Sequence, residues 1–334
     1  MAVKRQKRRA EVQFISPMKA TLVSAPPQQG DWLYELKFDG FRTVAVKNGN
    51  DVRLYSRNAK EFTARFPEIA EAVAGLSVER AVLDGEIVAV DEEGRSSFQL
   101  LQGVDTEAER PPIFFYVFDL LNDDGDELIT RPIEQRRKRL RKILEGVEEP
   151  IRLSMEISGD PKQLLEEVRR RGLEGIIGKE RGSLYEVDRR SKSWIKLKCA
   201  YEQEFVIGGF TPPEGSRQHF GALLVGYYER EKLQFAGKVG TGFNTAILKS
   251  LRQQMRPLER PTCPFANLPE RTQGKWRQNI TPGEMRLCHW VEPKLVCQVR
   301  LTEWTRDGKL RHPVFQGLRE DKDAREVVRE QPVG

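Results

Sequence analysis

One short stretch, Glu35 to Arg42, sets the strongest limits on how this chain can fold. Leu33 to Phe38 is patterned towards a β-strand, and Asp39-Gly40 reads as the turn that ends it. Lys37 is therefore expected at the end of a strand. If other cations lie beside it and water is partly excluded, its pKa is lowered and the neutral amine can act as a nucleophile.

The Lys-x-Asp-Gly string is a weak signal when taken alone. From average residue usage, roughly one chain in ten of this length contains such a string by chance. Most lysines at strand ends are also solvated. An ordinary surface lysine at position 37 therefore stays open until other features of the chain are considered.

Length and composition bound the protein class. A chain of 334 residues can bury a substantial core and is expected to form two domains. No apolar run approaches the roughly 20 residues that span a bilayer, and the basic segment Met1 to Glu11 has no apolar region after it, so a secretory signal is excluded. The net charge of +6 is compatible with nucleic acid without being diagnostic of it. Four cysteines without a C-x-x-C pair make a zinc site a poor interpretation and indicate a reducing cytosol.

Alternating runs predict a sheet after the lysine. Thr43 to Lys47 and Asp51 to Tyr55 are joined by Asn48-Gly49-Asn50, which is a strong hairpin signal. Phe66 to Leu76 reads as a short helix with a proline suited to its first turn. Next comes the strand Ala81 to Val90, and then the very apolar strand Pro111 to Leu121.

The first of these later strands contains the acids Asp84 and Glu86. A buried carboxylate costs several kcal/mol unless something compensates it, so the two acids either face solvent or serve a site. In the second strand, Phe118 is either a core residue or an aromatic ring that faces a ligand.

Two basic segments follow. Pro132 to Leu144 is predicted as a helix containing Arg136-Arg137-Lys138-Arg139, which is either a solvated face or a contact to phosphates. Asp160-Pro161 caps another helix that runs to about Arg171. In Ser193 to Lys198, Lys196 and Lys198 share one face of a strand and require an anion.

A domain boundary is expected between residues 200 and 204. Beyond it lie short strands over 205–210, 222–228, 233–238 and 295–304, with a helix over 244–255. Many short strands with one inserted helix predict a small β-barrel of the OB type. We therefore expect a basic disordered arm (1–15), a first domain (16–201) and an OB-fold domain (202–334).

Collected together, these residues fit nucleotide chemistry. Cations suit phosphates, a ring suits a base, and the acids Glu86 and Glu174 suit a hydroxyl or a divalent metal. An amine and a nucleoside triphosphate together imply attack on the α-phosphorus, which yields a lysyl-nucleotide and pyrophosphate.

In their order along the chain, the motifs resemble those of the covalent nucleotidyltransferases, and specifically of ATP-dependent DNA ligases. The resemblance rests on the following segments: Lys37-Phe38-Asp39-Gly40, Ser56-Arg57-Asn58, Leu83-Asp84-Gly85-Glu86, Phe118-Asp119-Leu120-Leu121, Leu173-Glu174-Gly175, Trp194-Ile195-Lys196-Leu197-Lys198 and Arg311-His312-Pro313-Val314-Phe315 with Arg319-Glu320-Asp321-Lys322. Residues 202–213 and 236–243 further resemble the ligase domain of bacterial non-homologous end-joining ligases of the LigD type.

The resemblance implies a fold of the α+β class. An ATP-grasp-like adenylation (nucleotidyltransferase) domain of antiparallel sheets with helices would precede the C-terminal OB-fold barrel. Three steps are implied: Lys37 takes AMP from ATP, the AMP passes to the 5′-phosphate at a nick in duplex DNA, and the 3′-hydroxyl displaces it.

Residue roles are also implied by the resemblance. Lys37, Asp39, Lys196 and Lys198 would be catalytic, and Glu86 and Glu174 would hold Mg²⁺ or Mn²⁺. Arg42, Arg57 and Arg311 would contact DNA. The ATP or AMP would be bound by Glu35, Leu36, Arg42, Arg57, Glu86, Phe118, Ile177, Lys196, Lys198, Arg319 and Lys322, with Asp321 beside the last two.

Partners and alternatives remain open. The resemblance raises Ku and separate end-processing polymerase or nuclease proteins as partners of a monomeric bacterial enzyme in the cytoplasm, at the nucleoid and away from membranes. An RNA ligase or a GTP-using capping enzyme shares much of the motif order. A non-catalytic DNA-binding OB module is the alternative from another class.

Overall fold

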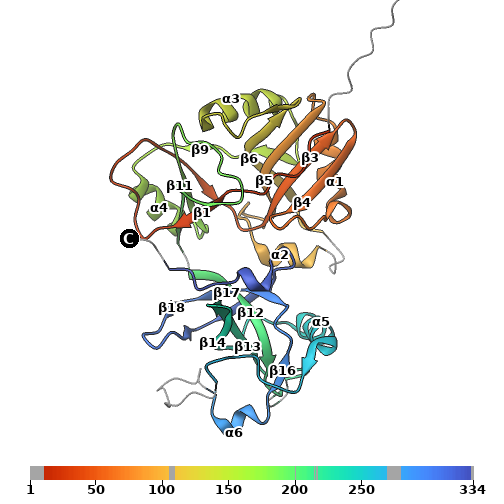
Figure 1. The fold of residues 1–334 in the computed structure, drawn as a ribbon, viewed down its shortest axis with the longest axis vertical. Coiled ribbons are helices and arrows are strands. Elements are labelled where there is room, and N and C mark those ends of the chain that lie inside the picture. Colours follow the sequence, from red (N-terminus) through yellow and green to blue (C-terminus); the bar gives the residue numbers. More distant parts are fainter. Residues whose placement is uncertain are drawn as a thin grey trace, which may run out of the picture. The chain divides into compact units, whose positions relative to one another are not determined.

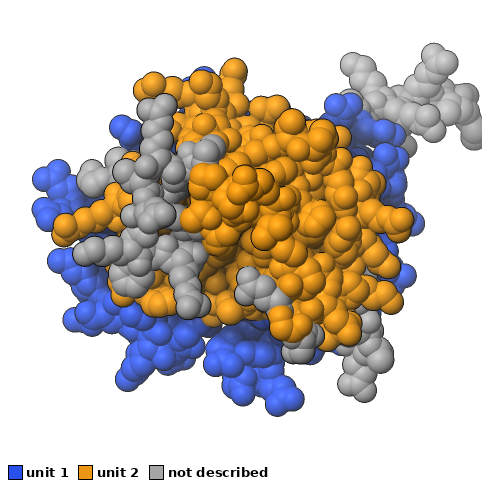
Figure 2. All heavy atoms as spheres, turned by 90° about the horizontal axis from the view of Figure 1, so that it is seen from below, with its two compact units in different colours: residues 1–199, 332–334 blue, residues 200–331 orange. Residues whose placement is uncertain are grey.

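The protein is described by a computed structural model that covers residues 11–104, 110–199, 201–213, 215, 217–268 and 280–331. This part of the chain divides into two compact units, one ending at Cys199 (unit 1) and one from Ala200 to Gln331 (unit 2). Figure 1 shows the ribbon with many of its helices and strands labelled, and Figure 2 colours the two units. No helix of the described part is both long and apolar enough to span a lipid bilayer.

The larger sheet of unit 1 is built on the predicted hairpin. β3 (Phe41–Asn48) and β4 (Asp51–Ser56) pair around a tight turn, which confirms the Asn48-Gly49-Asn50 signal. The strand order is β4-β3-β5-β6-β7, with β5 (Arg80–Ala89), β6 (Ile113–Asp123) and β7 (Asp126–Glu127), and β8 (Ile151–Leu153) pairs in parallel with β6.

Three helices cover one face of this sheet. They are α1 (Pro67–Ala74), α2 (Phe98–Gly103) and α3 (Ile133–Ile143), and a 3₁₀ turn (Thr63–Arg65) precedes α1. Ile69 of α1, Phe98 of α2 and Leu140 of α3 share one fully buried core with Phe115 of β6 and Leu83 of β5. The predicted helix after Phe66 is confirmed, with Pro67 in its first turn.

The second sheet of unit 1 carries Lys37. Its order is β1 (Lys19–Leu22), β11 (Arg190–Lys198), β10 (Gly175–Glu180), β2 (Trp32–Lys37) and β9 (Glu156–Ile157). All pairs are antiparallel except β1 with β11. α4 (Pro161–Arg170), capped by Asp160 as predicted, packs on one face through Val168.

The opposite face of that sheet turns toward the larger sheet. Trp194 of β11 and Val44 of β3 belong to the same buried cluster, together with Phe118 of β6. The candidate site therefore lies between two sheets of one unit, with side chains supplied by both of them.

Unit 2 has the strand order of an OB-fold. β12 (Tyr201–Phe210), β13 (Leu223–Glu229) and β14 (Lys232–Val239) form a meander, and β12 also pairs with β17 (Val296–Leu301), which pairs with β20 (Val314–Leu318). A parallel bridge from Thr241 to Val314 joins the ends, with a 2.9 Å hydrogen bond from the N–H of Phe315 to the carbonyl of Thr241. This closes a five-stranded barrel and confirms the predicted OB class.

The inserted helix of unit 2 is α5 (Thr245–Met255), and Asn244 caps it. Leu248 and Leu251 of this helix pack into the barrel core. The remaining elements are η2 (Arg256–Leu258), β15 (Glu259–Arg260), α6 (Pro282–Met285), β16 (His289–Val291), β18 (Glu303–Trp304), β19 (Leu310–Arg311) and η3 (Ala324–Glu326).

Parts of two basic segments, the predicted N-terminal arm and the arginine run of α3, are packed within unit 1. Residues 1–10 of the predicted arm lie outside the described residues, whereas Val12 exchanges hydrogen bonds of 2.9 and 3.0 Å with Asn48, and Phe14 packs edge-on against Tyr55. In α3, Arg136 and Arg137 are 0% and 1% exposed. Both interpretations of that run, a solvated face and a phosphate contact, are wrong for these two arginines.

Candidate active site

The face of the second sheet that turns away from α4 gathers the predicted cations. Residues opposite each other on neighbouring strands share a face, and so do residues two apart on one strand. Gly175 of β10 pairs with Lys37 of β2 and with Lys198 of β11. The side chains on this face therefore form three rows: Lys37, Gly175 and Lys198; Glu35, Ile177 and Lys196; and Leu33, Lys179 and Trp194.

Most of the predicted residues of these strands lie on that face. The placement of Lys196 and Lys198 opposite Ile195 and Leu197 is confirmed, since the two apolar residues pack with α4. Leu36 does not share the face of the lysines, because its side chain also joins the α4 core. A nucleotide on the lysine face could therefore contact the main chain of Leu36 but not its side chain.

Lys37 is held as an ammonium ion by Glu174, which directly precedes β10. The two side chains form an ion pair and are only 19% and 7% exposed. Burial acts to lower the pKa of Lys37, but the Glu174 carboxylate outweighs it, with help from Glu86 and Asp39, and the pKa is raised. The expectation of a pKa lowered by neighbouring cations is therefore wrong for this structure, because the charges that face the amine are carboxylates.

The same carboxylates offer ligands for a divalent cation. An oxygen of Asp39 lies within 4.8 Å of one of Glu174. Oε2 of Glu174 is buried and has no hydrogen-bond partner among the described residues. An orphaned carboxylate oxygen beside a second carboxylate is the kind of donor set that Mg²⁺ and Mn²⁺ accept. The residues present therefore fit such a metal.

Arg42 is fixed by the buried acid of the neighbouring strand. Its guanidinium donates to both oxygens of Asp84 at 2.6 and 2.7 Å. The Tyr185 hydroxyl also donates to Asp84 at 2.5 Å and accepts from the N–H of Met18 at 3.0 Å. Asp84 is therefore fully buried but compensated. Glu86 lies opposite Arg42 in the register and is half-buried.

Phe118 lies between the two sheets with its ring already covered. It is 9% exposed, and the charged groups of Arg42 and Lys179 each lie 4.6 Å from its ring centroid. Trp194 packs against it edge-on at 6.1 Å. Stacking of a nucleotide base on Phe118 stays a prediction, and it requires one face of the ring to be uncovered.

The remaining predicted residues are engaged within their own units. Arg57 follows β4, and its Nε donates weakly to Asn58 at 3.4 Å. In unit 2, Arg319 donates to both oxygens of Asp321 at 2.9 and 2.8 Å. The other two cations of unit 2 also form ion pairs: Lys322 with Glu204 at 2.9 Å, and Arg311 with Glu303.

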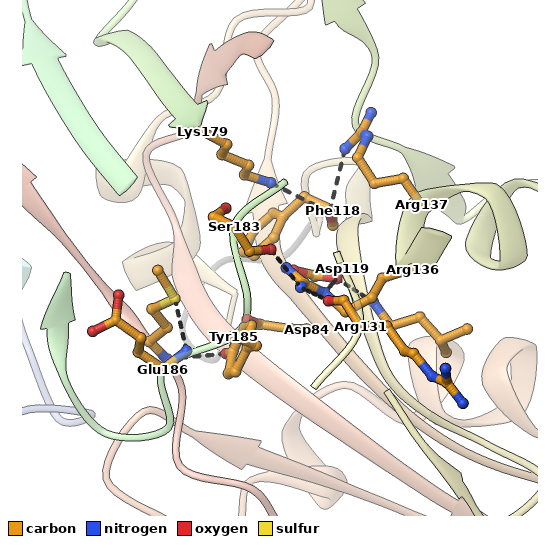
Figure 3. Close-up of polar contacts among 12 residues, drawn as sticks. Asp84, Phe118, Asp119, Arg131, Arg136, Arg137, Lys179, Ser183, Tyr185 and Glu186 are labelled. Carbon is orange, nitrogen blue, oxygen red and sulfur yellow. Dashed lines mark hydrogen bonds and ion pairs between the residues drawn. The ribbon is translucent and has the colours of Figure 1, made fainter. Parts of the chain in front are cut away.

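Sequence reasoning missed a second set of buried charges around α3 (Figure 3). Arg136 donates to both oxygens of Asp119 at 2.8 Å, and its third nitrogen donates to the carbonyls of Arg131 and Ser183. The Arg136 and Asp119 side chains are completely buried. The only sequence signal was the helical spacing of Ile133, Arg137, Leu140 and Leu144, which places Arg137 on the apolar side.

Arg137 belongs to a further group that includes a predicted nucleotide-binding residue. Oε1 of Glu35 pairs with Arg137 and accepts from Lys179 at 2.9 Å, and Oε2 accepts from the Ser154 hydroxyl at 2.7 Å. The four side chains (the Glu35 cluster: Glu35, Arg137, Ser154 and Lys179) are each at most 2% exposed. They join β2, α3, β10 and the segment between β8 and β9.

Comparison with known proteins identifies the family. Residues 16–198 match the family described as the ATP dependent DNA ligase domain, and residues 216–322 match the ATP dependent DNA ligase C terminal region. The chain belongs to the ATP-dependent DNA ligase family.

Within the ATP-dependent DNA ligases, the chain is similar to the ligase part of larger proteins. It is 45% identical over 326 residues to the multifunctional non-homologous end joining protein LigD of Pseudomonas aeruginosa, and 36% identical to that of Mycolicibacterium smegmatis. The first match covers 96% of this chain but only 37% of the length of that LigD. The resemblance to LigD-type ligase domains is confirmed.

Solved structures agree on the fold. The chain matches mycobacterial DNA ligase D complexed with ATP and MES at a TM-score of 0.63 and 33% identity, over 93% of this chain and 98% of the other. The ligase domain of Mycobacterium tuberculosis LigD matches at a TM-score of 0.50 and 35% identity, over 95% and 98% of the two chains. Both halves of the predicted fold, a nucleotidyltransferase domain and an OB-fold domain, are confirmed.

Proposed function

We propose that this chain seals 5′-phosphate/3′-hydroxyl nicks in duplex DNA with ATP, through AMP bonded to Lys37. The observation that carries the proposal is the row of Lys37, Gly175 and Lys198 with Glu174 beside the amine. Similarity to a ligase solved with ATP supports ATP as the substrate.

In the first step, Lys37 Nζ loses a proton and forms a bond to the α-phosphorus, while the bond to pyrophosphate breaks. Glu174 holds the ammonium in place until that proton leaves. Lys196 and Lys198 neutralise the phosphoryl oxygens on which charge develops. A divalent metal held by Glu174, with Asp39 or Glu86, would supply further neutralisation of the phosphates.

We assign Glu35, Ile177 and Phe118 to the base end of the nucleotide pocket, with Glu86 at the ribose. Arg42 and Arg57 would contact the nucleotide and the DNA 5′-phosphate, and Arg311 would contact DNA. Arg319 and Lys322 would contribute to the first step. Ku, end-processing proteins and a place at the bacterial nucleoid fit a role in end joining, by similarity to the LigD proteins.

A singly nicked duplex with a labelled 5′-phosphate tests the proposal. The protein with ATP and Mg²⁺ or Mn²⁺ should convert the nick to a continuous strand, and a nick with a 5′-hydroxyl should stay open. Replacing ATP by GTP, or the DNA nick by an RNA nick, should abolish most of the product. Sealing that prefers RNA or GTP would favour an RNA ligase or capping-type enzyme, and binding without any product would contradict the proposal.

A further inference from the structure

One guanidinium of the site is held in a closed ring of hydrogen bonds. Arg42 donates to Oδ1 and Oδ2 of Asp84 at 2.6 and 2.7 Å, and its Nη2 also donates to the carbonyl of Met18 at 3.3 Å. The Tyr185 hydroxyl donates to Oδ2 of Asp84 at 2.5 Å and accepts from the N–H of Met18 at 3.0 Å. These four residues (the Arg42 ring: Arg42, Asp84, Tyr185 and Met18) come from β3, β5, the segment between β10 and β11, and the position before β1.

Tyr185 completes the Arg42 ring from the buried side. It is 4% exposed and packs edge-on against Trp194 at 5.8 Å, and Figure 3 shows it beside Asp84. Burial, together with the Asp84 carboxylate, raises the pKa of Tyr185 well above its ordinary value, so the hydroxyl keeps its proton and donates it. Buried ion pairs are often no more stabilising than apolar side chains of similar volume. Stability alone therefore does not account for the Arg42 ring.

The Arg42 ring determines which edge of the guanidinium is left for a ligand. A guanidinium has five N–H groups, and the one on Nε and both on Nη2 are used within the ring. Nη1 carries the other two and has no hydrogen-bond partner among the described residues, while the Arg42 side chain keeps 21% exposure. The ring centroid of Phe118 lies 4.6 Å from the guanidinium carbon and limits tilting of its plane. Arg42 therefore offers two donors in a fixed direction, which suits a phosphate.

We propose that Tyr185, with the main chain of Met18, holds Arg42 so that Nη1 binds the 5′-phosphate at the nick. Tyr185 is then a positioning residue for recognition of that phosphate, because it acts through Asp84 and Arg42 and not on the DNA itself. This inference rests on the proposed function, in which Arg42 contacts the DNA 5′-phosphate.

The test compares binding of two nicked duplexes, one with a 5′-phosphate and one with a 5′-hydroxyl, because they differ only in the group that Arg42 would contact. Each protein is first incubated with ATP and Mg²⁺ and is then kept in EDTA during the binding measurement. The wild-type protein should bind the 5′-phosphate nick more tightly. Tyr185→Phe should lower this preference, the ratio of the two Kd values, by about tenfold, as expected for a disturbed hydrogen bond to a charged group.

A second variant tests whether Tyr185 acts through Arg42. Arg42→Lys removes the fork of donors that the Arg42 ring orients, so adding Tyr185→Phe to Arg42→Lys should lower the preference no further. Tyr34→Phe is the matched control, because this tyrosine packs with the α4 core on the opposite face of the second sheet. It should keep the wild-type preference.

The variants are chosen so that folding does not obscure the result. Tyr185→Phe keeps the aromatic ring against Trp194 and the ion pair of Arg42 with Asp84. Equal weakening on both nicks would indicate a structural role and overturn the proposal, as would an unchanged preference, a wild-type protein without the preference, or a further loss in the Arg42→Lys background. A Tyr185→Phe protein that forms no adduct with ATP would place Tyr185 in the first step and also overturn it. Failure of the proposed function is distinguishable, because the wild-type protein would then seal no nick.

Discussion

At the scale of single residues, the reactive amine is controlled by its acidic neighbours. Glu174, Asp39 and Glu86 all act to keep Lys37 protonated. Before the reaction, the nucleophile is therefore a protonated amine that these carboxylates hold in position. A nucleotide and a metal would compete for the same carboxylates. The chemistry of the site therefore depends on how charge is redistributed when ligands arrive.

The pKa of Lys179 predicts how stability changes with pH. Its pKa of about 8 in the folded protein lies below its ordinary value of 10.5, so below pH 8 the folded state bears the cost of the buried charge, about 3 kcal/mol. That cost disappears as pH rises from about 8 to 10.5, because the folded state releases the proton first. Lys179→Met removes the cost together with two hydrogen bonds of about 1 kcal/mol each.

Urea denaturation should therefore find Lys179→Met more stable than wild type by about 1 kcal/mol at pH 7, with the gain lost by pH 10. Lys138→Met should show no such pH dependence. A Lys179→Met protein that is clearly less stable at pH 7 would mean that the charge of Lys179 is compensated in the folded state.

Several predicted site residues were accessible from sequence because they sit in local motifs. The shared face of Lys196 and Lys198 follows from the period of a strand alone. The partners of the buried charges were not accessible. Tyr185 and Asp84 are 101 positions apart, and Arg137 and Glu35 are 102 apart, so only the folded topology brings them together.

At the scale of elements, α3 fastens the two sheets of unit 1 through its arginines. Arg136→Met should leave the Asp119 carboxylate buried without its partner, which costs about 3–5 kcal/mol of the free energy of unfolding. Lys138→Met on the same helix should change it by less than about 0.5 kcal/mol. Chemical denaturation of both variants measures the difference, and similar small effects would show that the Arg136 pair is not structurally important.

The close approach of β10 and β11 also depends on a single residue. A Cβ added to Gly175 would lie 2.0 Å from the carbonyl oxygen of Leu197, so Gly175→Ala should force the strands apart between Lys37 and Lys198. We expect a destabilisation of about 1–3 kcal/mol and a slower first step. Gly240→Ala, whose Cβ would meet only Ala222 at 3.8 Å, is the control. Unchanged nucleotidylation and stability in Gly175→Ala would contradict this account of the row.

The elements themselves followed from local patterns more readily than their arrangement did. The β3–β4 hairpin, α1 and the capped start of α4 were all predictable from turn and cap residues. The parallel pairing of β1 with β11 joins Lys19 to Arg190, and no local pattern specifies a partner so far along the chain.

At the scale of the whole molecule, a residue of unit 2 is expected to serve one step of the proposed reaction and not the others. If Lys322 serves only the transfer of AMP to Lys37, Lys322→Gln should lose sealing of an ordinary nick but retain sealing of a nick that already carries AMP on its 5′-phosphate. Lys249→Gln, at an exposed position of α5, should seal both substrates. Loss of both reactions in Lys322→Gln, with the fold intact by circular dichroism, would place Lys322 in DNA binding or in the later steps.

The central claim is that one lysine becomes bonded to AMP. After incubation with ATP and Mg²⁺, mass spectrometry of the wild-type protein should show an adduct of about 329 Da, the mass of one AMP residue added by covalent catalysis, on the peptide that contains Lys37. Lys37→Arg should show none, although its cation can still pair with Glu174. The same adduct on the Lys37→Arg protein, or no adduct on the wild-type protein, would contradict the account.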